Sequence, residues 1–240
     1  MSNGAEQELA VALAHMARDL LAQDTVQHTL DRVCEHAVEL VDGCEHAGIL
    51  TLHGTGGQAG RQRVETLAVT SDLVRASDRV QAELGEGPCL DAAADRAPVY
   101  RIGDVTSFEA RWPRYAPRAR ELGVGSMLGF LLYTEDDEFG AMDLYSTRPS
   151  AFTERSELVG WILASHAAVA LSSARTGAQL HSAIATRQLI GEALGIVMER
   201  HKIAEDEAFA VLRTISQHRN VKLRDIAEHI NTTGEIPEAR

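Results

Sequence analysis

Apolar residues recur at helical spacing along the first 42 residues of the chain. Steps of three and four positions predict two helices, with Leu9, Leu13, Met16, Leu20 and Leu21 in the first and Leu30, Val33, Ala37, Val38 and Val41 in the second. Asp24 precedes the second run and is a suitable N-cap. The pattern therefore predicts an N-terminal helix over residues 1–24 and a second helix directly after it.

The apolar pattern changes from helical to alternating after residue 46. It predicts strands at 47–54 and 63–71 around a glycine-rich turn, a helix at 72–85, and a short strand at 98–102 inside a segment of turn residues. Strands at 126–134 and 139–146 around an acidic turn predict a long hairpin. This order is typical of an α+β domain built on an antiparallel sheet flanked by helices.

From Thr153 onward the sequence predicts only helices. Thr153, Ser156 and Glu157 provide an N-terminal cap for a long apolar run. The next proline after Pro149 is Pro237, so this helix is free to continue into the following segment.

Three amphipathic stripes close the chain. Their apolar positions are Ile190, Ala193, Leu194, Val197 and Met198, then Ala208, Phe209, Val211, Leu212 and Ile215, then Leu223, Ile226, Ala227 and Ile230. One apolar face per helix predicts an all-α three-helix bundle. We therefore expect an α+β domain at 25–172, a helical linker at 173–186 and the bundle at 187–234.

The composition of the 240 residues is that of a soluble globular protein, with 45% apolar and 24% charged residues. No run approaches the ~20 apolar residues of a membrane span, and the N-terminus is acidic where a signal peptide is basic. We therefore expect a cytoplasmic protein that does not contact membranes. Three irregularly spaced cysteines, Cys34, Cys44 and Cys89, predict neither a disulfide framework nor a cysteine-rich zinc site.

The net charge of −12 belongs to one part of the chain. Residues 1–174 hold 14 Arg and no Lys against 26 Asp and Glu, whereas residues 175–240 hold 9 basic and 9 acidic residues. Both lysines, Lys202 and Lys222, lie in the second part. Such a step in composition indicates a C-terminal module with a different partner.

Polar and basic side chains gather near the ends of the three C-terminal helices. Such side chains contact the phosphates and unpaired bases of nucleic-acid loops. On charge alone, a solvated, salt-bridged surface is the favoured alternative, because the module is neutral. The candidate RNA-binding residues are Arg187, Gln188, Arg200, Lys202, Arg213, Gln217, Asn220, Lys222 and Arg224.

Residues 187–230 resemble the ANTAR family, the RNA-binding antiterminator modules of bacterial regulators. The matching positions are Ile190, Gly191, Ala193, Gly195, Met198, Glu199, Arg200, Glu207, Ala208, Phe209, Leu212, Asn220, Lys222, Leu223, Asp225 and Ala227. The resemblance implies a three-helix fold that acts in pairs, binds two adjacent RNA hairpins in a leader transcript and prevents a terminator from forming.

The sequence departs from many ANTAR members at three positions. Glu192 and Leu194 stand where a Gln and a Lys are common, and Ala204 stands where Ser often begins the second helix. A missing cation and an added carboxylate weaken contact with the RNA backbone.

Residues 25–172 resemble a GAF domain of the actinobacterial type. The turn at 85–89 and the strand-to-helix passage at 145–149, with Phe152, carry the resemblance. It implies an antiparallel sheet with helices behind it, a cavity for a small ligand, and dimerisation through the first and last helices. The candidate ligand-binding residues, which flank the turn and the following strand, are Cys89, Leu90 and Tyr100.

Cysteine and histidine chemistry leaves two alternatives open in this domain. Cys89 is either a thiol sensor or chromophore anchor, or a small buried residue of the turn. We favour the buried residue. Some GAF domains reduce free methionine sulfoxide with cysteines, but Cys34 falls on an early helix and Cys44 at the first strand. The histidines lie singly, without metal-site spacing, and His166 is expected in a core or an interface.

We therefore expect a non-enzymatic, cytoplasmic regulator with a GAF sensor, a helical linker and an ANTAR output domain. The expected partners are leader-transcript hairpins, a second copy of the chain and an unidentified small ligand, with no metal, other cofactor, membrane or DNA. One alternative is a protein-interaction or sensor module without RNA binding. A less favoured one is a thiol-dependent methionine sulfoxide reductase.

Overall fold

The computed structural model describes residues 2–53, 63–95, 98–133 and 138–238. The chain divides into two compact units, an N-terminal unit of Met1–Arg175 and a C-terminal unit of Thr176–Arg240. The glycine-rich turn at 54–62, and the acidic turn except for its last residue, lie outside the described residues.

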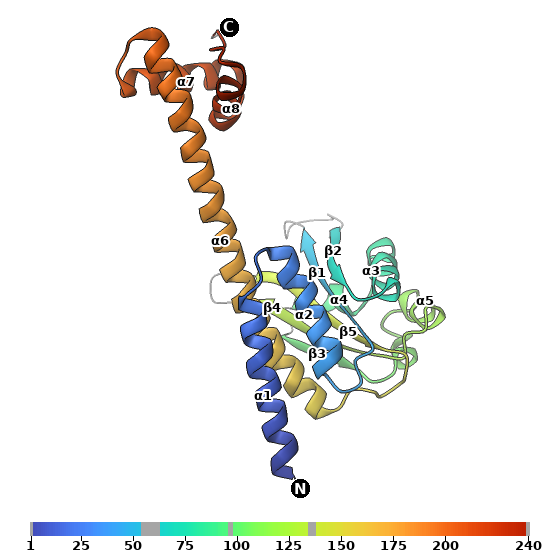
Figure 1. Cartoon of the computed structure of the whole chain (residues 1–240). Helices are drawn as coiled ribbons and strands as arrows, with labels where there is room; N and C mark the ends of the chain where they lie inside the picture. Colours follow the sequence, from blue (N-terminus) through green and yellow to red (C-terminus); the bar gives the residue numbers. More distant parts are fainter. Residues whose placement is uncertain (1, 54–62, 96–97, 134–137, 239–240) are drawn as a thin grey trace. The chain divides into compact units, whose positions relative to one another are not determined.

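The N-terminal unit is built on a five-stranded antiparallel sheet, as the alternating pattern predicts (Figure 1). Its spatial order is β2-β1-β5-β4-β3. The strands are β1 (His46–His53), β2 (Arg63–Val69), β3 (Val99–Ile102), β4 (Ser126–Tyr133) and β5 (Glu138–Ser146). The short strand β3 lies at one edge of the sheet.

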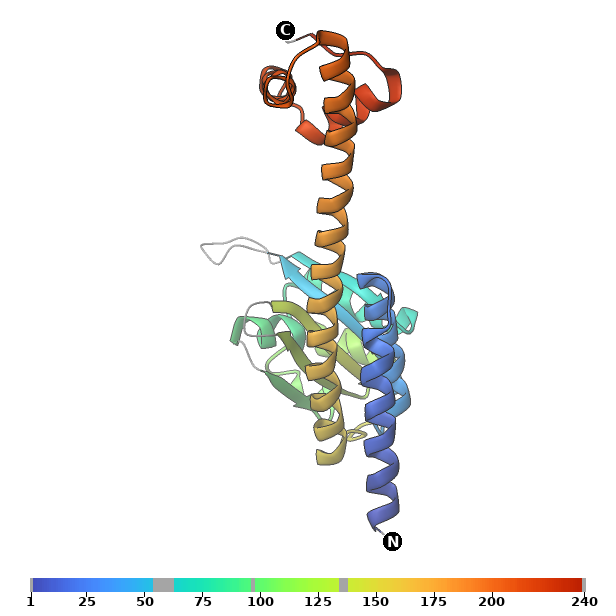
Figure 2. The same cartoon turned by 60° about the vertical axis from the view of Figure 1, so that its left-hand side comes forward.

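Two helices before the sheet and one after it cover the first face of the sheet. They are α1 (Ser2–Leu21), α2 (Val26–Leu40) and α6 (Glu154–His201). Alternate strand residues such as Ile49, Phe130 and Leu144 point into this core, where they meet Met16 and Leu163. Figures 1 and 2 both show α1 alongside the first half of α6.

The second face of the sheet is covered by α3 (Asp72–Leu84), α4 (Pro88–Asp95), a 3₁₀ turn η1 (Val105–Phe108) and α5 (Tyr115–Glu121). The other alternate set of strand residues, including Leu50, Met127 and Tyr145, points into this second core. Successive residues of a strand face opposite sides, so each strand contributes to both cores.

Two local expectations are wrong. Residues 88–95 form the helix α4, where the pattern indicates turn residues, because Pro88 occupies the first helical position, where a missing N–H costs nothing. Helix α2 is capped by Thr25, whose hydroxyl accepts a hydrogen bond from the His28 N–H at 3.1 Å, and not by the neighbouring Asp24.

The C-terminal unit consists of the end of α6, α7 (Glu205–Arg219) and α8 (Leu223–Thr233). The expected continuation of the long helix is confirmed, so the first helix of the predicted bundle is the end of α6. The predicted apolar stripes form its core, with Ala193, Val197, Leu212, Ile226 and Ile230 buried, but Phe209 of the second stripe is 40% exposed and lies outside it. Thr153 and Ser156 cap α6 through a 3.3 Å bond from the Ser156 N–H to the Thr153 hydroxyl.

Candidate functional site

All nine candidate RNA-binding side chains are exposed to solvent in the C-terminal unit. They do not form one patch, because Arg187 and Gln188 form one group along α6 and Arg200 and Lys202 another at its end. Arg187 and Arg200 are 13 residues apart on this helix, which corresponds to roughly 20 Å at the rise of an α-helix. An RNA that contacts both groups must therefore extend along the unit.

The turn between α7 and α8 concentrates five of the candidates. Arg213 and Gln217 are four residues apart and share a face of α7. Asn220 ends that helix in the left-handed conformation, with φ 52°, which Asn adopts more readily than most residues. Lys222 is the N-cap of α8, and Arg224 lies in its first turn. This turn is the densest group of predicted contacts.

Two candidates have partners within the unit. The Gln188 side-chain amide donates a 3.0 Å hydrogen bond to Glu192, and Lys202 forms an ion pair with Glu199. Glu192 also accepts a hydrogen bond from the Asn231 amide at 3.3 Å. The carboxylate that replaces the family's Gln thus links α6 to α8 and already accepts a hydrogen bond from Gln188.

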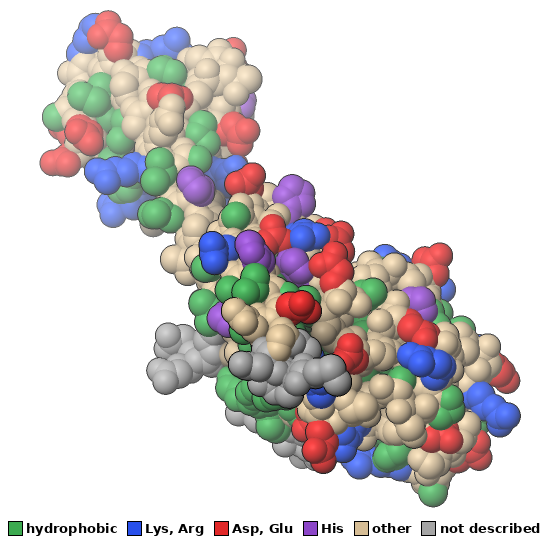
Figure 3. Space-filling model, turned by 60° about the horizontal axis from the view of Figure 1, so that its bottom comes forward, with side chains coloured by type: hydrophobic (Ala, Val, Ile, Leu, Met, Phe, Trp, Pro, Cys, Tyr) green, Lys and Arg blue, Asp and Glu red, His purple; other side chains and the backbone are tan. Residues whose placement is uncertain are grey.

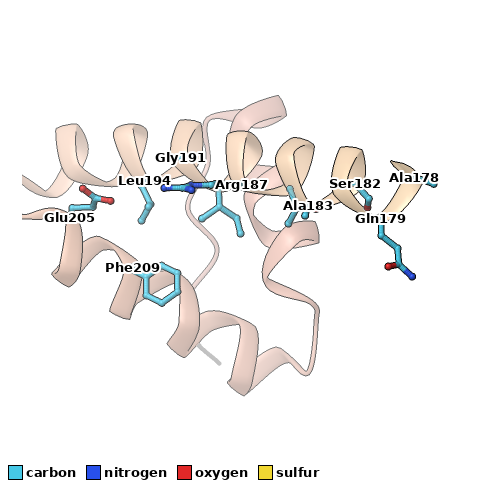
Figure 4. Close-up of a pocket in the computed structure, with 11 residues that line it drawn as sticks. Ala178, Gln179, Ser182, Ala183, Arg187, Gly191, Leu194, Glu205 and Phe209 are labelled. Carbon is cyan, nitrogen blue, oxygen red and sulfur yellow. The ribbon is translucent and has the colours of Figure 1, made fainter. Parts of the chain in front are cut away.

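An open groove of about 920 Å³ lies between α6 and the start of α7 (Figure 4). Leu194, which replaces the family's Lys, is 8% exposed and belongs to both the core and the groove wall. Across from α6 the Phe209 ring is 40% exposed. Arg187 and Glu205 place one charge of each sign at the groove.

Charges of both signs are interspersed on the C-terminal unit. Figure 3 shows Lys and Arg as well as Asp and Glu side chains on the visible face of this unit. This matches the neutral charge balance of residues 175–240. A nonspecific polyanion site needs a concentrated basic patch, so binding by this unit has to depend on shape and on individual contacts.

The candidate ligand-binding residues of the N-terminal unit meet a carboxylate that the sequence analysis missed. Asp143 on β5 is 1% exposed. One of its oxygens accepts a 2.5 Å hydrogen bond from the Tyr100 hydroxyl, and the other accepts one from the Cys89 thiol at 3.1 Å. Leu90 is buried beside them in α4. The structure therefore brings Cys89 and Tyr100 together around Asp143.

Two glycines make room for this carboxylate in the middle of the sheet. Gly48 on β1 and Gly129 on β4 are the residues paired with Asp143 on either side. A Cβ on Gly129 would lie 2.1 Å from the Tyr100 ring, and one on Gly48 would lie 2.4 Å from Val74. Because neighbouring side chains take up the space above both glycines, the cluster is closely packed.

A second buried carboxylate lies in the same cluster. Asp78 on α3 is 2% exposed and accepts hydrogen bonds from the Thr66 hydroxyl at 2.8 Å and the Tyr145 hydroxyl at 3.3 Å. Burial, with the nearby charge of Asp143, raises the pKa of Asp78 to about 7. Burial also raises the pKa of Asp143, although the hydrogen bonds from Tyr100 and Cys89 act in the opposite direction and lower it. The cluster thus contains two carboxyl groups that resist ionisation.

The three cysteines do not form a reactive set. Cys34 and Cys44 lie in the core on one face of the sheet and Cys89 in the core on the other. All three are buried. Burial raises the pKa of Cys44 to about 12 and the pKa of Cys34 and Cys89 well above the usual value. Thiol chemistry needs the thiolate, so this arrangement does not support a thiol cycle.

His166 on α6 is exposed, so of the two expected locations the core is wrong and an interface stays a prediction. Helix α6 is long and apolar enough to cross a membrane by length and composition. Buried Val159, Leu163 and Leu171 pack this helix into the core of the N-terminal unit, and core helices of soluble proteins share those properties.

Family models match both units of the chain. The model of the GAF domain matches residues 23–172, and that of the ANTAR domain matches residues 178–230. No curated protein matches the sequence.

Solved structures show the same fold for the N-terminal unit at low sequence identity. The GAF domain of a phosphoenolpyruvate-protein phosphotransferase from Coxiella burnetii is 16% identical, with a TM-score of 0.51, over 71% of this chain and 96% of that chain. A free methionine-R-sulfoxide reductase from Neisseria meningitidis is 15% identical, with a TM-score of 0.51, over 70% and 93%. A bacteriophytochrome from R. palustris is 11% identical, with a TM-score of 0.57, over 86% and 46%.

Proposed function

The chain belongs to the GAF domain family and carries a C-terminal ANTAR domain, and from this premise we propose that it is a signal-responsive antitermination regulator that binds paired hairpins in leader transcripts. The two matches indicate a regulatory protein with a sensor unit and an RNA-binding unit. The observation that carries the proposal is the ANTAR match, together with the exposed basic turn between α7 and α8.

Contacts to the loop of a hairpin are supported by the groove between α6 and α7. Aromatic rings stack on unpaired bases, and Phe209 offers an exposed ring there. Arg187 attracts the phosphates that flank such a base, whereas Glu205 repels them from the other side. We infer that one unpaired base of the loop enters this groove and that the backbone passes on the Arg187 side.

Lys222 supplies the first test of the RNA interface. Lys222→Ala removes one exposed cation, so we expect RNA affinity to fall several-fold. The slope of the logarithm of the binding constant against the logarithm of salt concentration should flatten by about one. Filter binding from low to moderate salt measures both quantities.

The control for this test is Arg79→Ala, which removes an exposed cation from α3 in the other unit. It should leave affinity and salt slope unchanged. If Lys222→Ala behaves like the control, Lys222 does not contact RNA.

A second copy of the chain is the partner that we propose for the exposed apolar side chains of the N-terminal unit. Leu158, Trp161 and Val169 on α6 are 61%, 38% and 55% exposed, and Val11 and Leu21 on α1 are 52% and 59% exposed. Apolar side chains concentrated on two helices mark an interaction surface. Two hairpins bound side by side require two RNA-binding units, which a homodimer provides.

Leu158→Asp combined with Trp161→Asp should convert a dimer to a monomer, because it places two charges in the buried interface. Analytical ultracentrifugation measures the mass. Tyr133→Asp, at an exposed aromatic residue of β4, is the control and should remain a dimer. A wild-type chain that sediments as a monomer at all concentrations would rule this interface out.

A further inference from the structure

The N-terminal unit contains two acidic side chains in one buried cluster, on elements far apart in the sequence. Asp78 lies on α3 and Asp143 on β5, and both face the core between the sheet and α3, α4 and α5. The hydrogen bonds that they accept come from neutral groups, namely the hydroxyls of Thr66 and Tyr145 for Asp78 and the hydroxyl of Tyr100 and the thiol of Cys89 for Asp143.

The titratable groups around the pair come from every element that covers it. They are Cys89 on α4, Tyr100 on β3, Tyr115 on α5 and Tyr145 on β5. Burial raises the pKa of each of these four groups, so they stay neutral near pH 7. The positive charge that acts on Asp78 is the exposed Arg75 on the same helix. Among these described groups, Asp78 is therefore the one whose charge changes near neutrality, next to an Asp143 whose pKa is also raised by burial.

Two negative charges in one buried cluster repel each other strongly, because the interior screens them poorly. The pKa of Asp78, raised to about 7, means that it keeps its proton into the neutral range. Once that proton leaves, the structure lowers the energy of the pair by admitting water to it. The elements that are least costly to displace are the edge strand β3, which is four residues long, and α4, which is eight.

We propose that Asp78 and Asp143 hold one proton between them near neutral pH, and that its loss releases β3 and α4 from the sheet, so that the N-terminal unit responds to proton concentration. Tyr100 and Cys89 connect these two elements to the pair, because each donates to Asp143. The proposal goes beyond RNA binding and does not depend on it.

Hydrogen–deuterium exchange of the full chain tests the opening. After correction for the intrinsic pH dependence of exchange, amides of β3 and α4 should exchange roughly tenfold faster at pH 6 than at pH 5 and level off above pH 7, since each pH unit between the ordinary pKa of Asp and the raised pKa of Asp78 changes the open population about tenfold. Asp78→Asn should remove this increase. Asp72→Asn, an exposed acid on the same helix, should retain it.

Thr66→Val separates titration from simple loosening of the fold. This change removes the hydroxyl that donates to Asp78 and favours its charged form, so the pH at which the opening levels off should move higher. The C=O stretch of a protonated carboxyl group in infrared spectra provides the direct readout of the proton. It should be present at pH 6, nearly absent at pH 8, and absent already at pH 6 in Asp78→Asn.

Exchange of β3 and α4 that is the same at pH 5 and pH 6, or a levelling-off pH that Thr66→Val leaves in place, would overturn the proposal. A carboxyl signal unchanged by Asp78→Asn would also overturn it. None of these results bears on RNA binding, which the basic turn between α7 and α8 tests separately.

Discussion

Leu212→Ala should unfold the C-terminal unit at urea concentrations that leave the N-terminal unit folded. Leu212 is 0% exposed at the centre of the three-helix core, and a buried Leu→Ala change costs about 2–5 kcal/mol. A bundle of this size has only a few kcal/mol of stability in total. RNA binding should be lost together with the unit.

The position of the two tryptophans makes this result measurable. Trp112 and Trp161 both lie in the N-terminal unit, so their fluorescence follows that unit alone, whereas circular dichroism follows both. Val221→Ala, at a side chain that is 37% exposed, is the control and should cost less than about 1 kcal/mol. A single transition in which both signals move together for Leu212→Ala would show that the units do not unfold separately.

The second large effect is a loss of folding stability as the pH rises from the ordinary pKa of an Asp side chain to the raised pKa of Asp78. The folded-state pKa of about 7 is above the ordinary value of 3.8. Below pH 4 the carboxyl is protonated in both states, and its contribution to stability is fully present. Between pH 4 and pH 7 the unfolded chain releases this proton while the folded chain keeps it, so stability falls.

The expected size of this loss is of the order of 1–4 kcal/mol at pH 8 relative to pH 4. Asp78→Asn carries no such charge, so it should be more stable than wild type at pH 8 and nearly equal to it at pH 4. Urea unfolding followed by tryptophan fluorescence at both pH values measures the difference. Asp72→Asn should follow wild type, and an Asp78→Asn variant that is less stable than wild type at pH 8 would contradict the assigned pKa.

Much of the fold could be predicted because each element carries its own periodicity. The alternating residues of β1, β4 and β5 separate into the two cores, and the stripes of α7 and α8 form the third. Local choices between neighbours were less predictable. Asp24 and Thr25 are both good N-caps, and nothing in the sequence pattern favours Thr25 over Asp24.

The buried acid pair could have been suspected but not assembled from the sequence. Asp78 lies on the same helical face as the buried Val74, Ser77 and Gln81, and Asp143 has the parity of the buried Ala141 and Tyr145. Those positions signal a buried carboxylate. Their common location depends on the packing of α3 over the sheet, and the Tyr100 contact spans 43 residues of sequence.

For the candidate RNA-binding residues, the sequence predicted which side chains are exposed but not which partners they have. Polar and basic residues near the helix ends gave Arg187, Arg200 and Lys222 as candidate contacts, and all three are exposed. Sequence did not show that Lys202 and Gln188 have acidic partners. These partners depend on side-chain geometry, and they make the turn between α7 and α8 the group of candidates that we favour most.

The most direct test of the central claim is the affinity of the full chain for a leader-type RNA with two adjacent hairpins, compared with the same RNA reduced to one. Paired binding units gain from effective concentration, so we predict that the two-hairpin RNA binds at least tenfold more tightly. Lys222→Ala and Arg224→Ala together should weaken both complexes. Equal, weak binding of the two RNAs and of a scrambled sequence would contradict the account and favour a protein-interaction module.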